Sequence, residues 1–218
     1  MKGSMEQDTD NDCFYRVDVI FQNEEVTDME ILRTFLALET DPHVIKHIME
    51  LISPIQDKLK GIRWVGPSNI HLTLKFFGDT TIDQRRQIIE ELKPIAGRQR
   101  IMNLEAARMG CFPNVRNPRI VWIGLTGDVE PLEGLYREVE DGMARLGWEQ
   151  EERPFTPHLT IGRQRKDHRE KDMPYYIEKL ENESFGKWTV DRMVLFKSLL
   201  TREGAIYTPI EILPFGQQ

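Results

Sequence analysis

Two histidine–threonine pairs are the residues of this sequence best suited to chemistry. They lie in the segments HLTL, residues 71–74, and HLTI, residues 158–161. Alternate residues of a β-strand point to the same face of a sheet. In each segment the imidazole and the hydroxyl would therefore share one face, while the aliphatic residues face the core. The pattern predicts two rigid strands that each present one proton-transfer group and one hydroxyl.

Two such strands facing each other are suited to the hydrolysis of a cyclic phosphodiester. Water must lose a proton as it attacks phosphorus, and the departing sugar oxygen must gain one on the opposite side. Histidine titrates near neutral pH, so one imidazole can accept a proton while the other donates one. Thr73 and Thr160 can donate hydrogen bonds to the non-bridging oxygens. We expect His158 to be the general base and His71 the general acid, in a scheme that requires no metal ion.

The two segments belong to an internal repeat. His71 and His158 are 87 residues apart, and Pro67 and Pro154 have the same separation. One such segment alone would more often be an ordinary strand with a polar face. Two copies at equivalent places of a duplicated unit favour a functional pair.

Periodicity places these segments in an alternating order of strands and helices. Strands are expected near residues 31–39, 70–77, 119–125, 158–162, 188–197 and 205–213. Helices are expected at 42–61, 81–96, 128–146 and 173–182, with caps at Asp41, at Thr80 or Thr81, and at Asp128. The order predicts an α+β fold with two pseudo-symmetric β-α-β-α-β lobes. Their antiparallel sheets would surround a central cleft, with the helices outside.

Composition sets limits on the partners and the location of the protein. The 218 residues carry a formal net charge of −7. This charge argues against a surface for long stretches of nucleic acid but is compatible with a local cationic pocket. No apolar run is long enough to span a bilayer, and two cysteines form no disulfide framework, so we expect a cytoplasmic monomer. Residues 1–28 are expected to be an N-terminal extension, in part vector-derived, and residues 29–218 the two-lobed domain.

Beyond the two motifs, several further segments carry a resemblance to a known family. They are RTFLAL (33–38), GIRWV (61–65), NIHLTLKFFG (69–78), FP (112–113), PFTPHLTIGR (154–163) and VLFKS (194–198). In this combination the sequence resembles the two-histidine phosphoesterase superfamily, defined by two HxTx motifs. Within it, the sequence is most similar to the RNA 2′,3′-cyclic phosphodiesterase branch, historically called 2′-5′ RNA ligase. The resemblance implies opening of a 2′,3′-cyclic phosphate to a 2′-phosphate, on RNA ends or small cyclic nucleotides, without metal or cofactor.

The resemblance also implies roles for single residues. His71 and His158 match the catalytic pair of the family, and Arg163 matches an arginine that contacts phosphate. Strict alternation would place Arg163 on the face opposite His158, so a bulge or bend at Gly162 is required.

Other aromatic and basic residues are weaker candidates for substrate binding. Phe35, Phe112 and Trp122 are possible stacking surfaces for a base, although core packing is the more common role for such residues. Local positive charge could come from Arg33, Lys75, Arg116 and Arg119, although solvent exposure is the usual state of such side chains. The predicted substrate-binding set is Thr73, Thr160, Arg163, Phe35 and Arg33.

Other functions remain open at this point. The same site could join RNA ends, or bind a nucleotide without catalysis, or be a purely structural α+β domain. His43 and His47 have the spacing of zinc ligands on a helix, near Glu50, but two ligands on an exposed helix are more often solvated. The charge-dense stretch 163–171 is expected to be a loop that could steer an RNA end.

Overall fold

The structure is a computed structural model that describes residues 30–166, 168, 170–202 and 204–216. The predicted extension, residues 1–28, lies outside the described residues. The strands are β1 (Leu32–Glu39), β2 (Ile62–Trp64), β3 (His71–Thr80), β4 (Met102–Phe112), β5 (Ile120–Gly127), β6 (His158–Gln164), β7 (Ser184–Val190), β8 (Arg192–Leu200) and β9 (Ala205–Pro214). The helices are α1 (Pro42–Gln56), the short 3-10 turn η1 (Pro67–Asn69), α2 (Ile82–Arg98), α3 (Val129–Arg145) and α4 (Met173–Lys179).

The helix starts follow the capping residues. The carboxylate of Asp41 accepts a hydrogen bond from the backbone N–H of His43 at 2.7 Å, with Pro42 in the first turn of α1. Thr81 and Gln84 form a reciprocal capping box at the start of α2. Asp128 precedes α3 as predicted, but its carboxylate accepts from the backbone N–H of Asn103 instead of capping the helix.

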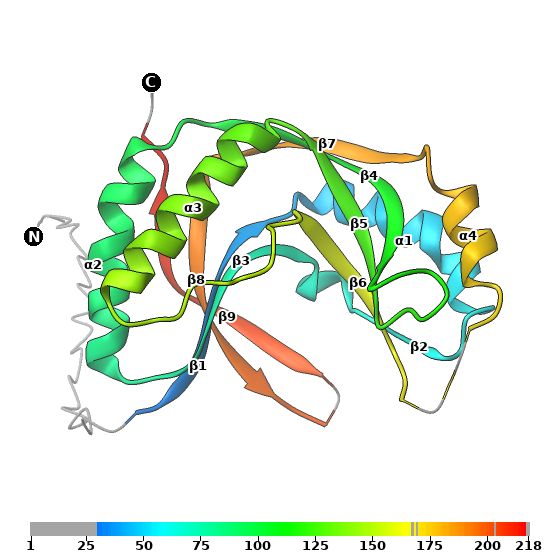
Figure 1. Ribbon diagram of the computed structural model, residues 1–218, viewed down its shortest axis with the longest axis horizontal. Coiled ribbons are helices and arrows are strands. Elements are labelled where there is room, and N and C mark those ends of the chain that lie inside the picture. Colours follow the sequence, from blue (N-terminus) through cyan, green and yellow to red (C-terminus); the bar gives the residue numbers. More distant parts are fainter. Residues whose placement is uncertain (1–29, 167, 169, 203, 217–218) are drawn as a thin grey trace, which may run out of the picture.

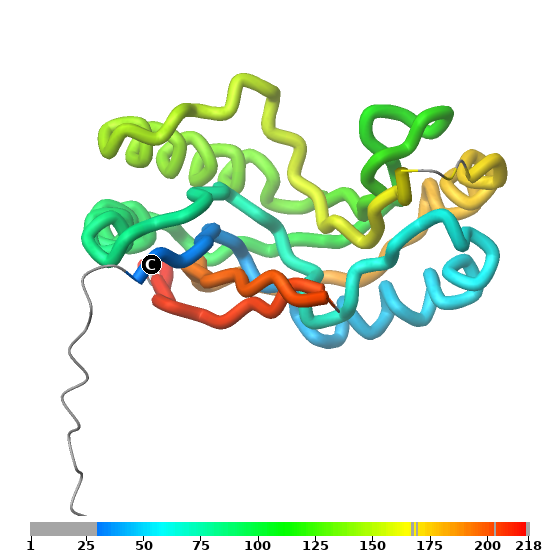
Figure 2. Tube along the Cα trace, turned by 90° about the horizontal axis from the view of Figure 1, so that it is seen from below, coloured from blue at the N-terminus to red at the C-terminus, as the bar shows by residue number. Residues whose placement is uncertain are grey.

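The strands form two sheets, and the predicted fold class is confirmed. The first sheet has the order β3-β1-β8-β9 and the second the order β2-β6-β5-β4-β7. Within the described residues, neighbouring strands of both sheets pair antiparallel. Helices α2 and α3 lie side by side at one end of the molecule, and α1 and α4 lie at the other (Figures 1 and 2).

The two halves of the chain exchange strands. The first half supplies β2 and β4 to the second sheet, and the second half supplies β8 and β9 to the first sheet. The sequence did not predict β2 or β4, and it merged parts of β7 and β8 into one strand. In β4 the alternation is interrupted at Arg108, which has a positive φ of 65° and lies at a register shift. A strict period of two therefore fails to reveal this strand.

One large apolar core joins the two sheets and the helices. The aliphatic residues of both histidine-bearing segments belong to it, with Leu72, Leu74, Leu159 and Ile161 exposed by at most 3%. Both histidines and their threonines are only partly buried. The alternation predicted for the two motifs is therefore present, with the polar residues on the face away from this core.

Candidate active site

The two candidate catalytic histidines open two strands from different sheets. His71 is the first residue of β3, and His158 is the first residue of β6. These two strands contact each other and lie side by side near the middle of the molecule (Figures 1 and 2). The fold thus brings together two segments that are 87 residues apart in the sequence.

Pairing between β1 and β3 decides which side chains share the face of His71. Residues directly opposite each other in an antiparallel pair project from the same face. Because β1 has no extra residue in this register, its alternate residues mark one face. The pairs on the His71 face are Arg33–Asp79, Phe35–Phe76, Ala37–Thr73 and Glu39–His71.

Pairing between β5 and β6 decides which side chains share the face of His158. The alternate β5 residues 120, 122 and 124 lie opposite Arg163, Thr160 and His158. Ile161 is an additional residue in β6, because Val121 pairs with the following Gly162. This bulge places Arg163 on the face of His158, where the alternation alone would not have put it.

The imidazole of His71 lies in an aromatic environment. Its ring stacks on Phe35 with centroids 5.0 Å apart, and Tyr207 approaches it edge-on at 5.3 Å. Burial among these rings lowers the pKa of His71 to about 4, against the opposing effect of a hydrogen bond to the backbone of Asn69. His71 is therefore neutral at neutral pH when no substrate is bound.

His158 has a different set of neighbours. Its Nδ1 lies 2.7 Å from the carbonyl oxygen of Thr156, and the ring of Phe112 approaches it edge-on at 5.0 Å. Burial lowers the pKa of His158, the Thr156 hydrogen bond opposes this shift, and the charge of Arg163 adds to it. Donation from Nδ1–H to the carbonyl leaves Nε2 available to a substrate in the neutral ring. Each histidine is thus held by the backbone two residues before it.

The predicted stacking role of Phe35 does not fit its position. Phe35 is only 2% exposed and forms a small apolar cluster with Ala37, Val194 and Phe196 on the site face of the first sheet. Its ring contacts those of His71, Phe196 and Tyr207, and its low exposure leaves no surface on which a base could stack. Phe35 instead desolvates the imidazole. Phe112 and Trp122 remain partly exposed beside His158.

The basic residues separate into site and non-site positions. Arg163 is exposed on the His158 face. Arg33 is exposed on the His71 face, but it pairs with Asp79 at the opposite end of β3 from His71, and Arg119 is exposed just before β5. Lys75 is neither in the site nor solvated, as it lies opposite Leu36 on the core face and is 8% exposed. Leu74 is the additional residue of a bulge in β3, and this bulge moves Lys75 away from the face that alternation predicted.

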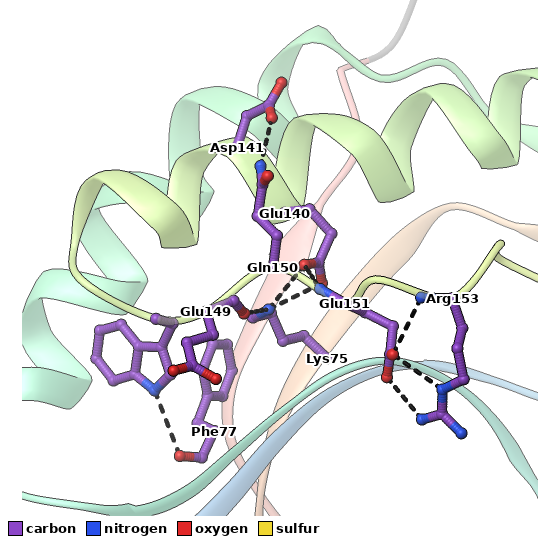
Figure 3. Close-up of polar contacts among 9 residues, drawn as sticks. Lys75, Phe77, Glu140, Asp141, Glu149, Gln150, Glu151 and Arg153 are labelled. Carbon is purple, nitrogen blue, oxygen red and sulfur yellow. Dashed lines mark hydrogen bonds and ion pairs between the residues drawn. The ribbon is translucent and has the colours of Figure 1, made fainter.

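Lys75 connects the first motif to the segment that leads into the second (Figure 3). Its Nζ donates to the carboxylate of Glu140 on α3 at 2.8 Å and to the carbonyl of Glu149 at 2.8 Å. The same carboxylate accepts from the backbone N–H of Glu151 at 2.9 Å. The indole of Trp148 adds a hydrogen bond to the carbonyl of Phe77 at 3.3 Å. These contacts tie the chain before β6 to the strand that carries His71.

Phe76 and Tyr207 are the site residues that sequence reasoning missed. Phe76 is 62% exposed and lies on the His71 face. Strict alternation from His71 would place it in the core, so the sequence gives no direct sign of its exposure. Tyr207 comes from β9, whose position beside the site depends on the strand exchange.

The remaining candidates lie outside this site. In the described part of the chain, no group of three or more His, Cys, Asp or Glu residues is arranged to hold a metal ion. His47, one of the spaced pair on α1, instead makes a contact of 3.2 Å from Nδ1 to the carbonyl of Phe185. A hollow of about 650 Å³ runs along α1 and a smaller one of about 210 Å³ lies near Asn117 and His168; neither histidine of the motifs lines them. Among the described helices, none is long and apolar enough to cross a membrane.

Solved structures share this fold. The protein TT0787 of Thermus thermophilus superimposes with a TM-score of 0.71 at 22% identity, over 86% of this chain and all of that one. Escherichia coli LigT in complex with 3′-AMP gives a TM-score of 0.67 at 24% identity, over 85% of this chain and 99% of that one. These likenesses define the architecture as that of the LigT-like proteins.

Sequence comparison is more specific. Residues 42–202 match the model of the 2′-5′ RNA ligase superfamily, and the chain belongs to this family. The RNA 2′,3′-cyclic phosphodiesterase of Aquifex aeolicus is 31% identical over 86% of this chain and 100% of its own length. The protein of the same name from Methanothermobacter thermautotrophicus is 32% identical over 83% of this chain and 97% of its own length.

Proposed function

We propose that this protein hydrolyses RNA 2′,3′-cyclic phosphate ends to 2′-phosphates, with His71 and His158 as a metal-free acid–base pair. The observation that carries the proposal is the pairing of two imidazoles, each with a threonine on the same face, on two strands that contact each other. The names of the relatives, which cover most of this chain, support the same activity.

The reaction requires two proton transfers at one phosphorus. One histidine takes a proton from water as its oxygen bonds to phosphorus, and the bond from phosphorus to the ribose 3′-oxygen breaks. The other histidine gives its proton to that departing oxygen, so the product carries a 2′-phosphate. Thr73 and Thr160 donate to the non-bridging oxygens, and Arg163 offsets the negative charge that develops there.

The lowered pKa values constrain how the pair works. Both free imidazoles lose their protons easily, so the histidine that acts as acid must gain its proton when the negatively charged phosphate enters. An anion beside an imidazole raises the pKa of that imidazole. The assignment of His158 as base and His71 as acid stays a prediction. It requires the bound phosphate to offset the aromatic burial of His71.

The direct test uses an oligonucleotide that ends in a 2′,3′-cyclic phosphate, incubated in EDTA with the wild-type protein or with His158→Ala. We expect wild type alone to form a product one water heavier that resists a 3′-phosphatase, because its phosphate is on the 2′-oxygen. Adding a second oligonucleotide with a 5′-hydroxyl would reveal joined products if the site also ligates. Tight nucleotide binding without conversion between pH 5 and 8 would instead indicate a binding module.

A further inference from the structure

A second arginine lies beside Arg163 on the face of His158. In the pairing of β2 with β6, Arg63 is directly opposite Arg163. Directly opposite residues share a face, and Arg163 has already been placed on the face of His158 and Thr160. Arg63 therefore belongs to the same face, on the edge strand of the second sheet.

The two arginines form a like-charged pair without an acidic partner. Both are exposed, and neither forms an ion pair with any acidic residue in the described part of the chain. Like charges directly opposite each other in a sheet are destabilising. An anionic ligand that lies across both guanidinium groups would remove this cost.

The position of the pair indicates which anion it binds. Arg163 shares the face of His158 and Thr160, and its charge adds to the effect of burial in lowering the pKa of His158. Arg63 is one strand further out, about 4.8 Å in the direction of strand pairing. Arg163 is thus placed for the reacting phosphate, and Arg63 for a second anion further from His158. In an RNA end, the next anion is the phosphodiester on the 5′ side of the terminal nucleotide.

We propose that Arg63 binds this internucleotide phosphate and so makes the enzyme prefer an RNA end to a free cyclic nucleotide. This inference rests on the proposed function and extends it from the reacting phosphate to the length of the substrate. A guanidinium group suits the role because it is permanently charged and can donate two parallel hydrogen bonds to phosphate oxygens. The bond is made in the ground state and the transition state alike, so it acts mainly on KM.

Three substrates test the proposal. They are a nucleoside 2′,3′-cyclic phosphate, a dinucleotide ending in the same group, and that dinucleotide with an uncharged methylphosphonate linkage. We expect wild type to have a KM roughly tenfold lower for the charged dinucleotide than for its methylphosphonate analogue, as for loss of one hydrogen bond to a charged group. In Arg63→Gln this ratio should fall to about one. The wild-type ratio should also shrink as salt is added.

Arg100→Gln is the matched control. It removes the same charge from an exposed arginine between α2 and β4, and should keep the wild-type ratio. Thermal melting would show that Arg63→Gln is folded. The proposal is overturned if Arg63→Gln keeps the wild-type ratio of the two KM values, or if it lowers kcat/KM by the same factor for all three substrates.

A binding measurement separates this proposal from the proposed function. Calorimetric titration with the two dinucleotides ending in a 2′-phosphate requires no turnover. If wild type hydrolysed none of the substrates, the proposed activity would be wrong. The ratio of the two Kd values, in wild type and Arg63→Gln, would still decide whether Arg63 binds the linking phosphate.

Discussion

The two histidine-bearing strands are alike up to the threonine and differ immediately beyond it. Both β3 and β6 begin with histidine, leucine and threonine, and both have a bulge at the next residue, Leu74 or Ile161. The second residue after each bulge then returns to the site face. In β3 that residue is Phe76, which is 62% exposed, and in β6 it is Arg163.

This difference makes the two sides of a nearly symmetric site chemically distinct. The proton-transfer groups are duplicated, as a reaction with an attacking and a departing oxygen requires. The flanking residues are an aromatic ring on one side and a guanidinium group on the other. We infer that the base of the terminal nucleotide lies toward Phe76, while the phosphates lie toward Arg163.

The two strands are also anchored differently on the core side. Lys75 in β3 forms a buried ion pair with Glu140, whereas the equivalent residue of β6 is Gly162. A Cβ atom at Gly162 would lie 2.6 Å from Cγ2 of Ile62, so the Ile62 side chain of β2 fills the space that a side chain at this position would need. On its core side, β3 is therefore held by an ion pair, and β6 is held by close side-chain packing.

Removing either histidine should have the largest effect on activity. We expect His71→Ala and His158→Ala each to lower kcat/KM by about 10²–10⁴-fold, because each removes one proton transfer. With an aryl phosphodiester, whose leaving group needs no proton, the variant that lacks the acid should recover and the other should not. Recovery of His71→Ala alone would confirm His71 as the acid, and recovery of His158→Ala alone would reverse the roles.

Breaking the buried ion pair should have the largest effect on stability. Lys75→Met leaves Glu140 charged and unpaired in the core, which should cost about 3–5 kcal/mol of unfolding free energy. The double variant Lys75→Met with Glu140→Leu should recover most of this loss, measured by denaturant unfolding. If the single variant were as stable as wild type, the pair would not anchor β3.

Phe76→Ala should weaken substrate binding by a smaller amount. Stacking of a base on an aromatic side chain contributes about 1–3 kcal/mol, so KM for a nucleoside 2′,3′-cyclic phosphate should rise by about five- to 150-fold. Phe76→Tyr should retain wild-type KM because it keeps the ring. Leu199→Ala removes another exposed apolar side chain, on β8, and serves as the control. An unchanged KM in Phe76→Ala would place the base elsewhere.

The pKa difference between the two histidines should produce the smallest effect. In an NMR titration without substrate, His71 should gain its proton only near pH 4, since burial disfavours its charged form down to that pH. His158 should also titrate below its usual range, and Arg163→Gln should raise its pKa by removing a nearby positive charge. The pKa of His71 should not move in that variant. A shift of both residues would show that Arg163 does not distinguish the two histidines.

The sequence by itself determined the local features of this protein. The spacing of His71 and Thr73, and of His158 and Thr160, places each pair on one face because strands have a period of two. Asp41 and Thr81 start their helices because their side chains accept hydrogen bonds from backbone N–H groups of the first turn. The repeat and the motifs also indicated the α+β class and the family.

Only the tertiary structure decided what surrounds the two pairs. A bulge arises from the pairing of two strands. Alternation alone therefore predicts neither that Phe76 faces the site in place of Lys75 nor that Arg163 does. The contact between β3 and β6, and the approach of Tyr207 from β9, depend on strands exchanged between the halves. These pairings join residues far apart in the sequence. They are determined by the burial of one common core and not by the conformational propensities of the local residues.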